Sequence, residues 1–182
     1  MRNKKVMNNE ATGRDIQVNK GEFTIVTRDD YLRVDNLCKG LLLKFYEHLL
    51  ETGLPPEDAT TLANGADYFV RDFLVDCKGY NLFDERPGIV KQFAGNWYIV
   101  NTIEPDIQQL SRHLQGVRAF YGWLCEQKLI SVEYLMLLEK ECGILSYYEA
   151  RIEDFWKIEG DGFIEWERRC SLKDLPAIMG RA

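Results

Sequence analysis

A chain of 182 residues with 46% hydrophobic and 12% aromatic residues is long enough to bury one core, but it is short for two enzyme-sized domains. Its formal net charge of −6 excludes attraction to nucleic acid through a general positive field. The charge is spread unevenly, because residues 1–28 hold six basic and three acidic side chains while the rest of the chain carries −9. Binding to nucleic acid would therefore depend on local patches and on this N-terminal segment.

The five cysteines are odd in number and include no Cys-x-x-Cys pair, so neither a zinc cluster nor a disulfide framework is expected. No apolar run approaches the ~18 residues that can cross a bilayer, and the N-terminus MRNKKVMNNE lacks the apolar core of a signal peptide. The sequence therefore predicts a cytoplasmic protein with no membrane contact, no cofactor and no evident small-molecule substrate.

Residues 1–26 are predicted to form a flexible basic arm, because no hydrophobic period runs through most of this segment. A long amphipathic helix is predicted over residues 27–53, where apolar residues recur at steps of three and four. Thr27 followed by Asp30 resembles a capping arrangement at its start. A Pro-Pro pair ends this helix, since proline cannot donate the next backbone hydrogen bond.

A second helix is predicted over residues 58–76, closed by a glycine soon afterwards. Pro87 is expected to open a third, shorter helix, and the following segment YIVNT to be a short extended piece. Pro105 then opens a fourth helix with a continuous apolar seam.

Ser131 is expected to cap a fifth helix, and Ser146 with Glu149 matches a capping box that would start a sixth. The last stretch, FIEWERRCSL, fits either a final helix or an edge strand. Helical patterns dominate, so the predicted class is all-α, with a bundle over residues 27–131 and a helical extension over residues 132–182.

No catalytic motif stands out. The two histidines, His48 and His113, lie beside no serine or cysteine in a nucleophile pattern, so an enzyme would require a hollow that joins His113 to carboxylates. The run KIEGDGFIEWER resembles part of a calcium loop, but Lys157 and Arg168 would occupy its first and last positions, where calcium needs carboxylates. Metal binding and catalysis are therefore not expected.

The fourth helix carries a polar row opposite its apolar seam, spaced by three or four residues: Gln108, Arg112, Gln115 and Arg118. Arginine can pair with phosphate or with a guanine edge, and glutamine with adenine, so this row has the chemistry to enter a DNA groove. The alternative is an ordinary solvated face of a core helix.

Three segments in this order, GLPPEDATTLANGADYFVRDFLVD, PGIVKQFAGNWYI and IQQLSRHLQGVRAFYGWLCEQKLIS, resemble the N-terminal core-binding domain of the tyrosine recombinases, or phage integrases. The residues that match the final helix of that domain are Arg112, Leu114, Val117, Arg118, Phe120, Tyr121, Trp123 and Leu124. The resemblance covers about residues 35 to 135. It implies a SAM-like orthogonal four-helix bundle that clamps double-stranded DNA, with its second and fourth helices at the major groove.

The resemblance also implies which residues would contact DNA. They are Asn64 and Arg71 on the second helix, Lys91 on the third, and Arg112, Gln115 and Arg118 on the fourth. Family members carry a catalytic domain after this bundle, with an Arg, a Lys, a His-x-x-Arg motif and a nucleophilic Tyr. The chain after Ser131 has no such set, so no strand transfer is expected.

The charge of the expected DNA-binding part is low, since residues 53–131 hold seven basic and ten acidic side chains. Few phosphate contacts support only weak duplex binding. Two hypotheses follow. The first is a catalytically inactive, recombinase-like protein that binds DNA weakly or modulates DNA recombination and integration. The second is a protein–protein interaction module without DNA binding, with Tyr147, Tyr148 and Trp166 of the C-terminal helices as exposed anchors.

Overall fold

The computed structural model describes residues 16–170, and each regular element in this range is helical. The predicted all-α class is therefore confirmed. The helices are α1 (Asp30–Glu51), α2 (Pro56–Asp67), α3 (Ile89–Gln92), α4 (Tyr98–Asn101), α5 (Ile107–Glu126), α6 (Val132–Gly143), α7 (Leu145–Trp156) and α8 (Gly162–Arg168), with a 3-10 turn η1 (Lys20–Phe23) and two π-helical segments, η2 (Tyr68–Cys77) and η3 (Phe93–Trp97). No helix in the described range is long and apolar enough to cross a membrane.

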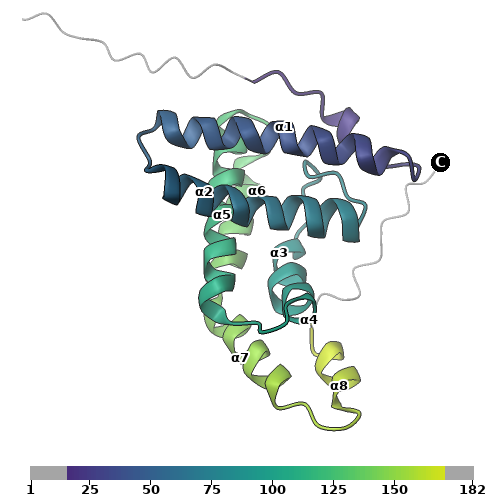
Figure 1. Cartoon of the computed structure of the whole chain (residues 1–182). Coiled ribbons are helices and arrows are strands. Elements are labelled where there is room, and N and C mark those ends of the chain that lie inside the picture. The colour runs from purple at the N-terminus through teal and green to yellow at the C-terminus, as the bar shows by residue number, and fades with distance from the viewer. Residues whose placement is uncertain (1–15, 171–182) are drawn as a thin grey trace, which may run out of the picture.

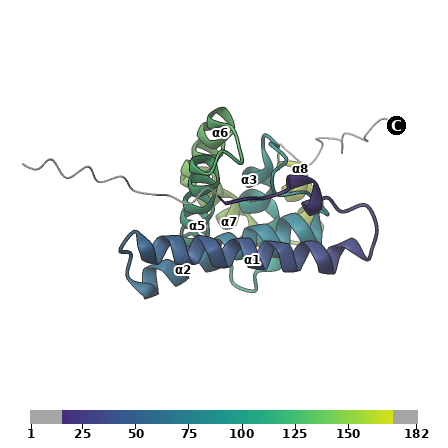
Figure 2. The ribbon, with the colours of Figure 1, turned by 90° about the horizontal axis from the view of Figure 1, so that it is seen from above.

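The helices form two groups that cross each other. Helix α1 lies side by side with α2 and η2, and α5 runs crosswise to that pair with α6 beside it (Figures 1 and 2). Helix α7 continues from α6, and α8 packs against α7. This crossing brings the start of α5 against the end of α2, where the candidate site lies.

Residues 1–15 of the expected N-terminal arm lie outside the described residues. Residues 16–26, its remainder, contact the bundle, because Phe23 is buried and its ring meets the Phe83 ring edge-on at 5.0 Å. The first long helix begins at Asp30, with Asp29 at its N-cap position and no side-chain cap, so the expected capping by Thr27 is wrong. The carboxylate of Asp30 accepts hydrogen bonds from the Thr27 backbone N–H at 2.8 Å and from the Thr27 hydroxyl at 3.0 Å.

The second predicted helix is one continuous rod built from α2 and η2. Its last turns are π-helical, with the Lys78 N–H donating to the Phe73 carbonyl at 3.0 Å, five residues back. Gly79 follows with φ +64°, which glycine adopts without strain, so the predicted end near this glycine is confirmed. A π-turn widens a helix locally, which helps this short segment bury a broad apolar face.

Two further local predictions are wrong. The segment YIVNT is helical as far as Asn101, because the buried Tyr98 and Ile99 continue the inward face of η3. Helix α7 begins at Leu145 without a side-chain cap, so Ser146 does not act as its capping residue. The cap at Ser131 is confirmed, since its hydroxyl accepts the Tyr134 N–H at 3.1 Å.

The last stretch, for which a helix and an edge strand were both considered, forms helix α8. The residue that holds it is Arg151, which is 5% exposed. Its Nε donates to the Gly95 carbonyl at 3.0 Å and its Nη1 to the Trp166 carbonyl at 2.7 Å, while the guanidinium lies 3.9 Å from the centre of the Trp166 ring.

This packing corrects the prediction of exposed aromatic anchors. Trp166 is buried under Arg151, and Tyr148 is buried with its hydroxyl donating to the Glu141 carbonyl at 2.7 Å. Only Tyr147 of the three retains part of its surface.

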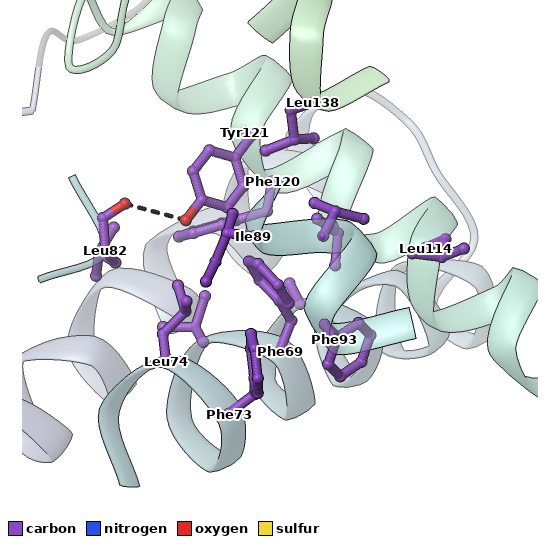
Figure 3. Packing of buried hydrophobic residues seen from close by; sticks show 14 of the residues in the cluster. Phe69, Phe73, Leu74, Leu82, Ile89, Phe93, Leu114, Phe120, Tyr121 and Leu138 are labelled. Atoms are coloured by element: carbon purple, nitrogen blue, oxygen red, sulfur yellow. Dashed lines mark hydrogen bonds between the residues drawn. The ribbon is translucent and has the colours of Figure 1, made fainter. Parts of the chain in front are cut away.

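The core between the two groups of helices is largely aromatic. Rings from η2, η3 and α5 meet there, and the Tyr121 hydroxyl donates to the Leu82 carbonyl at 3.0 Å (Figure 3). The Phe69 and Phe93 rings meet edge-on at 5.1 Å. These contacts fix η2 and α5 relative to each other, and both segments form walls of the candidate site described below.

Two glycines let α2 and α5 approach closely. A Cβ atom added to Gly116 would lie 2.3 Å from the Leu62 carbonyl oxygen, and one added to Gly65 would lie 2.9 Å from the His113 Cα. Backbone atoms therefore touch at the crossing. As a result Asn64 and His113, from different helices, border the same space.

Candidate binding surfaces on α2 and α5

The predicted polar row of α5 faces solvent. Gln108, Arg112, Gln115 and Arg118 are all exposed, and the one carboxylate of this helix is at its last residue, Glu126. Among the described residues, no hydrogen bond or ion pair occupies Arg112 or Arg118. Two cations on α5 are therefore available to a partner.

Arg71 is not available in the same way. Its Nε lies 2.6 Å from Asp35 Oδ1 and its Nη1 lies 3.0 Å from Asp67 Oδ1, so α1 and α2 hold the half-buried guanidinium between two carboxylates. Partial burial opposes the charge, but the hydrogen bonds that Arg71 donates to these two carboxylates raise the pKa of Arg71 overall. A phosphate would have to displace both of them.

The structure distributes the six residues predicted to contact DNA over separate places. Asn64 is exposed at the end of α2, next to the start of α5. Gln115 and Arg118 border a shallow hollow with Glu139 of α6. Lys91 is half-buried on α3, which packs against η3 and α6. Arg112 and Arg118 thus lie on one helix but beside different neighbours, Arg118 next to Glu139 of α6, whereas Arg71 is paired with two carboxylates.

A larger hollow of about 750 Å³ opens beside the crossing of α2 and α5. We call it the acidic hollow, and its described lining comprises Asn64, Asp67, Tyr68, Asp72, Tyr98, Asn101, Thr102, Ile103, Glu104, Asp106, Gln109 and His113. Four of these residues are carboxylates and none is lysine or arginine. The hollow has an acidic wall without a cation in it.

The four carboxylates of the hollow differ in their partners. Asp67 pairs with Arg71, and Asp106 accepts the Gln109 N–H at 2.8 Å as the cap of α5. Among described residues, no hydrogen bond or ion pair engages Asp72 or Glu104. Partial burial and the neighbouring carboxylate of Asp67 raise the pKa of Asp72. A cation entering the hollow would stabilise its charged form.

His113 lies between two tyrosine rings. Its ring centre is 4.8 Å from that of Tyr68 and 5.8 Å from that of Tyr98. Burial, and then the nearby charge of Arg112, lower the pKa of His113, so its imidazole is neutral at neutral pH. Burial also raises the pKa of Tyr98 to about 12, and its hydroxyl donates to the Asp106 carbonyl at 3.1 Å.

The hollow joins His113 to carboxylates, which is the geometry that the enzyme hypothesis required. Within residues 16–170, no ion pair joins His113 to a carboxylate, and the lining holds neither serine nor cysteine. A general base needs an orienting partner and a group from which to take a proton. The arrangement is suited to binding a cation.

Sequence reasoning did not find the acidic hollow. Its walls come from α2, η2, the segment between α4 and α5, and α5 itself, so no local motif contains it. The available signal was the acidic series Asp67, Asp72 and Asp76 on the second predicted helix, which appeared only as a lack of positive charge.

Compared with known proteins, the chain matches no family model, no curated protein and no solved structure.

Proposed function

We propose that this chain is a non-catalytic binding protein whose helical bundle contacts a partner protein through the face that contains the acidic hollow. The observation that carries the proposal is the state of Arg71. This residue was expected to bind DNA, but it is paired with Asp35 and Asp67, beside a hollow whose wall is acidic. A phosphate backbone is repelled by such a face, whereas a protein surface with basic groups complements it.

In this proposal the bundle derives from a recombinase core-binding domain but no longer binds DNA through its second helix. The order of a long first helix, a second helix, short helical pieces and a long fourth helix running crosswise agrees with a SAM-like bundle. On this scaffold the face of the second helix has become acidic. Modulation of DNA recombination would then act through a bound recombinase or similar partner rather than through the duplex.

Site-specific photo-crosslinking in the full chain tests the proposal. A photoreactive residue is placed at Ile103, on the rim of the acidic hollow, or at Gln115, on the exposed row of α5. We expect a discrete protein adduct from at least one position in the native cell. If neither position gives a protein adduct, the proposal is wrong, and strongly salt-dependent binding of a duplex by the intact chain would then favour direct DNA binding.

Direct DNA binding by α5 is the second candidate, and the exposed row of Gln108, Arg112, Gln115 and Arg118 favours it. Two phosphate contacts correspond to a salt slope of only about −2. In fluorescence anisotropy with a duplex, replacing both arginines by alanine should remove that slope if α5 binds DNA. Replacing Arg71 by alanine should leave the slope unchanged. If Arg71→Ala changes the salt slope more than the loss of the two α5 arginines does, the second helix and not α5 is the main DNA contact.

A further inference from the structure

We infer that the acidic hollow receives a lysine or arginine side chain from an extended segment of the partner protein, with the next apolar residue of that segment packed on Ile103 and Trp156. This inference rests on the proposed function and specifies the chemistry of the partner.

The charge of the hollow selects a cationic side chain. Asp72 and Glu104 have no described partner, whereas the other two lining carboxylates are already engaged, Asp67 by Arg71 through both oxygens and Asp106 as the cap of α5. Groups of three or more metal-ligating side chains do not come together anywhere in residues 16–170. A metal ion needs several of these ligands at once, whereas the ammonium of lysine or the guanidinium of arginine can pair with one or two separate carboxylates, so the carboxylates match a cationic side chain better than a metal ion.

The aromatic part of the hollow favours the same occupant. The Tyr68 and His113 rings lie 4.8 Å apart, centre to centre, at an interplanar angle of 34°, and both residues are half-buried in the lining. A cation near a tyrosine ring gains attraction from the ring's electron density, and the aliphatic stem of lysine or arginine packs well on flat apolar surface. The volume of about 750 Å³ leaves room for the stem and for the backbone that carries it.

Two exposed apolar side chains at the rim are independent of the carboxylates. Ile103, in the lining of the hollow, is 96% exposed. Trp156, 57% exposed, is tied to the same loop because its Nε1 donates to the Pro105 carbonyl at 3.3 Å. A single exposed apolar residue needs no explanation, but Ile103 lines the acidic hollow and Trp156 contacts the loop that supplies part of its wall. The matching occupant has a basic residue followed by an apolar one.

A peptide titration followed by NMR tests the inference on the isotopically labelled full chain. The probe is acetyl-Gly-Lys-Ile-Gly-amide, and its control carries glutamate in place of lysine. We expect saturable shifts of the Asn64, Tyr68 and Ile103 amides with the lysine peptide, weakened by added salt, and none with the glutamate peptide. Shifts spread over the whole surface, or equal shifts with both peptides, would overturn the inference.

A matched pair of variants locates the charge. Asp72→Asn with Glu104→Gln removes two negative charges from the hollow, and Glu133→Gln with Glu149→Gln removes two from exposed positions on α6 and α7. The hollow variant should bind the lysine peptide at least about tenfold more weakly, whereas the control should stay within about twofold. Equal losses in both variants would show general charge attraction and reject the site.

Magnesium chloride alone provides a third arm. Saturable magnesium shifts at the same amides would identify a metal site instead and overturn the inference. The inference and the proposed function can fail separately. If the Gln115 crosslink to a protein forms while the hollow variant binds the lysine peptide as the unchanged chain does, the inference fails, because a partner exists but does not use the hollow. If no crosslink forms, the proposed function itself fails.

Discussion

The carboxylate of Asp72 in the acidic hollow is available to a cationic partner, but its charge lowers the stability of the free fold. Partial burial and the nearby carboxylate of Asp67 raise the pKa of Asp72 above its ordinary value. The folded state therefore binds this proton more tightly than the unfolded state does, so the charged carboxylate lowers the free energy of unfolding at neutral pH. The cost disappears as the pH falls below the unfolded pKa of ~3.9, where both states are protonated.

The variant Asp72→Asn should consequently be more stable than the unchanged chain at pH 7. We expect its thermal unfolding midpoint to rise by about 1–2 °C, because solvent screens a partly exposed group and each kcal/mol shifts a chain of this size by ~2–4 °C. The gain should vanish near pH 3. Asp58→Asn is the control, since Asp58 lies in the first turn of α2, where its charge is favourable, and its loss should lower the midpoint. A lower unfolding midpoint for Asp72→Asn at pH 7 would contradict the proposed electrostatic cost of the Asp72 charge.

At the scale of elements, periodicity predicts the long helices, and chemistry from distant segments decides the rest. The apolar steps of three and four locate α1 and α5, and Ser131 caps α6 by accepting the Tyr134 N–H, a contact between residues three apart in the sequence. Ser146 offers an equally good local pattern, yet α7 starts without it. The difference is tertiary, because buried Tyr148 fixes the start of α7 through its hydrogen bond to Glu141. No local signal marks Arg151 as buried, since its partners lie on η3 and α8.

Helix α8 should therefore depend on one guanidinium. In Arg151→Lys the amine cannot reproduce the planar contact with the Trp166 ring together with both carbonyl hydrogen bonds, so we expect a loss of about 1–3 kcal/mol in the opening free energy of α8. Hydrogen exchange measured by mass spectrometry should show faster exchange in α8 with little change in α1. Arg168→Lys, on the exposed side of α8, should exchange as the unchanged chain does. Equal protection of α8 in both variants would mean that other contacts hold it.

For the whole molecule, the crossing of α2 and α5 both closes the core and shapes the acidic hollow. Side-chain chemistry at Asn64 and His113 is visible in the sequence, but their proximity depends on Gly65 and Gly116, which read in the sequence only as weak helix formers. The resemblance to the recombinase domain grouped Arg71 with the cations of α5, and sequence positions alone do not show the carboxylates that face this arginine. Packing of α1 against α2 adds Asp35, and that contact determines the charge of the face.

The variant Gly116→Ala should disturb stability and binding together. Its Cβ would lie 2.3 Å from the Leu62 carbonyl oxygen and 2.8 Å from the Ala66 backbone nitrogen, and backbone atoms cannot turn aside as a flexible side chain can, so the helices must separate. We expect a loss of about 1–3 kcal/mol in urea unfolding. We also expect the variant to bind the lysine peptide more weakly in the absence of urea, where its fold persists. Gly122→Ala is the matched control on the same helix: no atom lies within 4 Å of its added Cβ, and alanine should stabilise α5 by about 0.5–1 kcal/mol. If Gly116→Ala binds the peptide as the control does, the hollow does not depend on the crossing, and its walls must be held by the aromatic core alone.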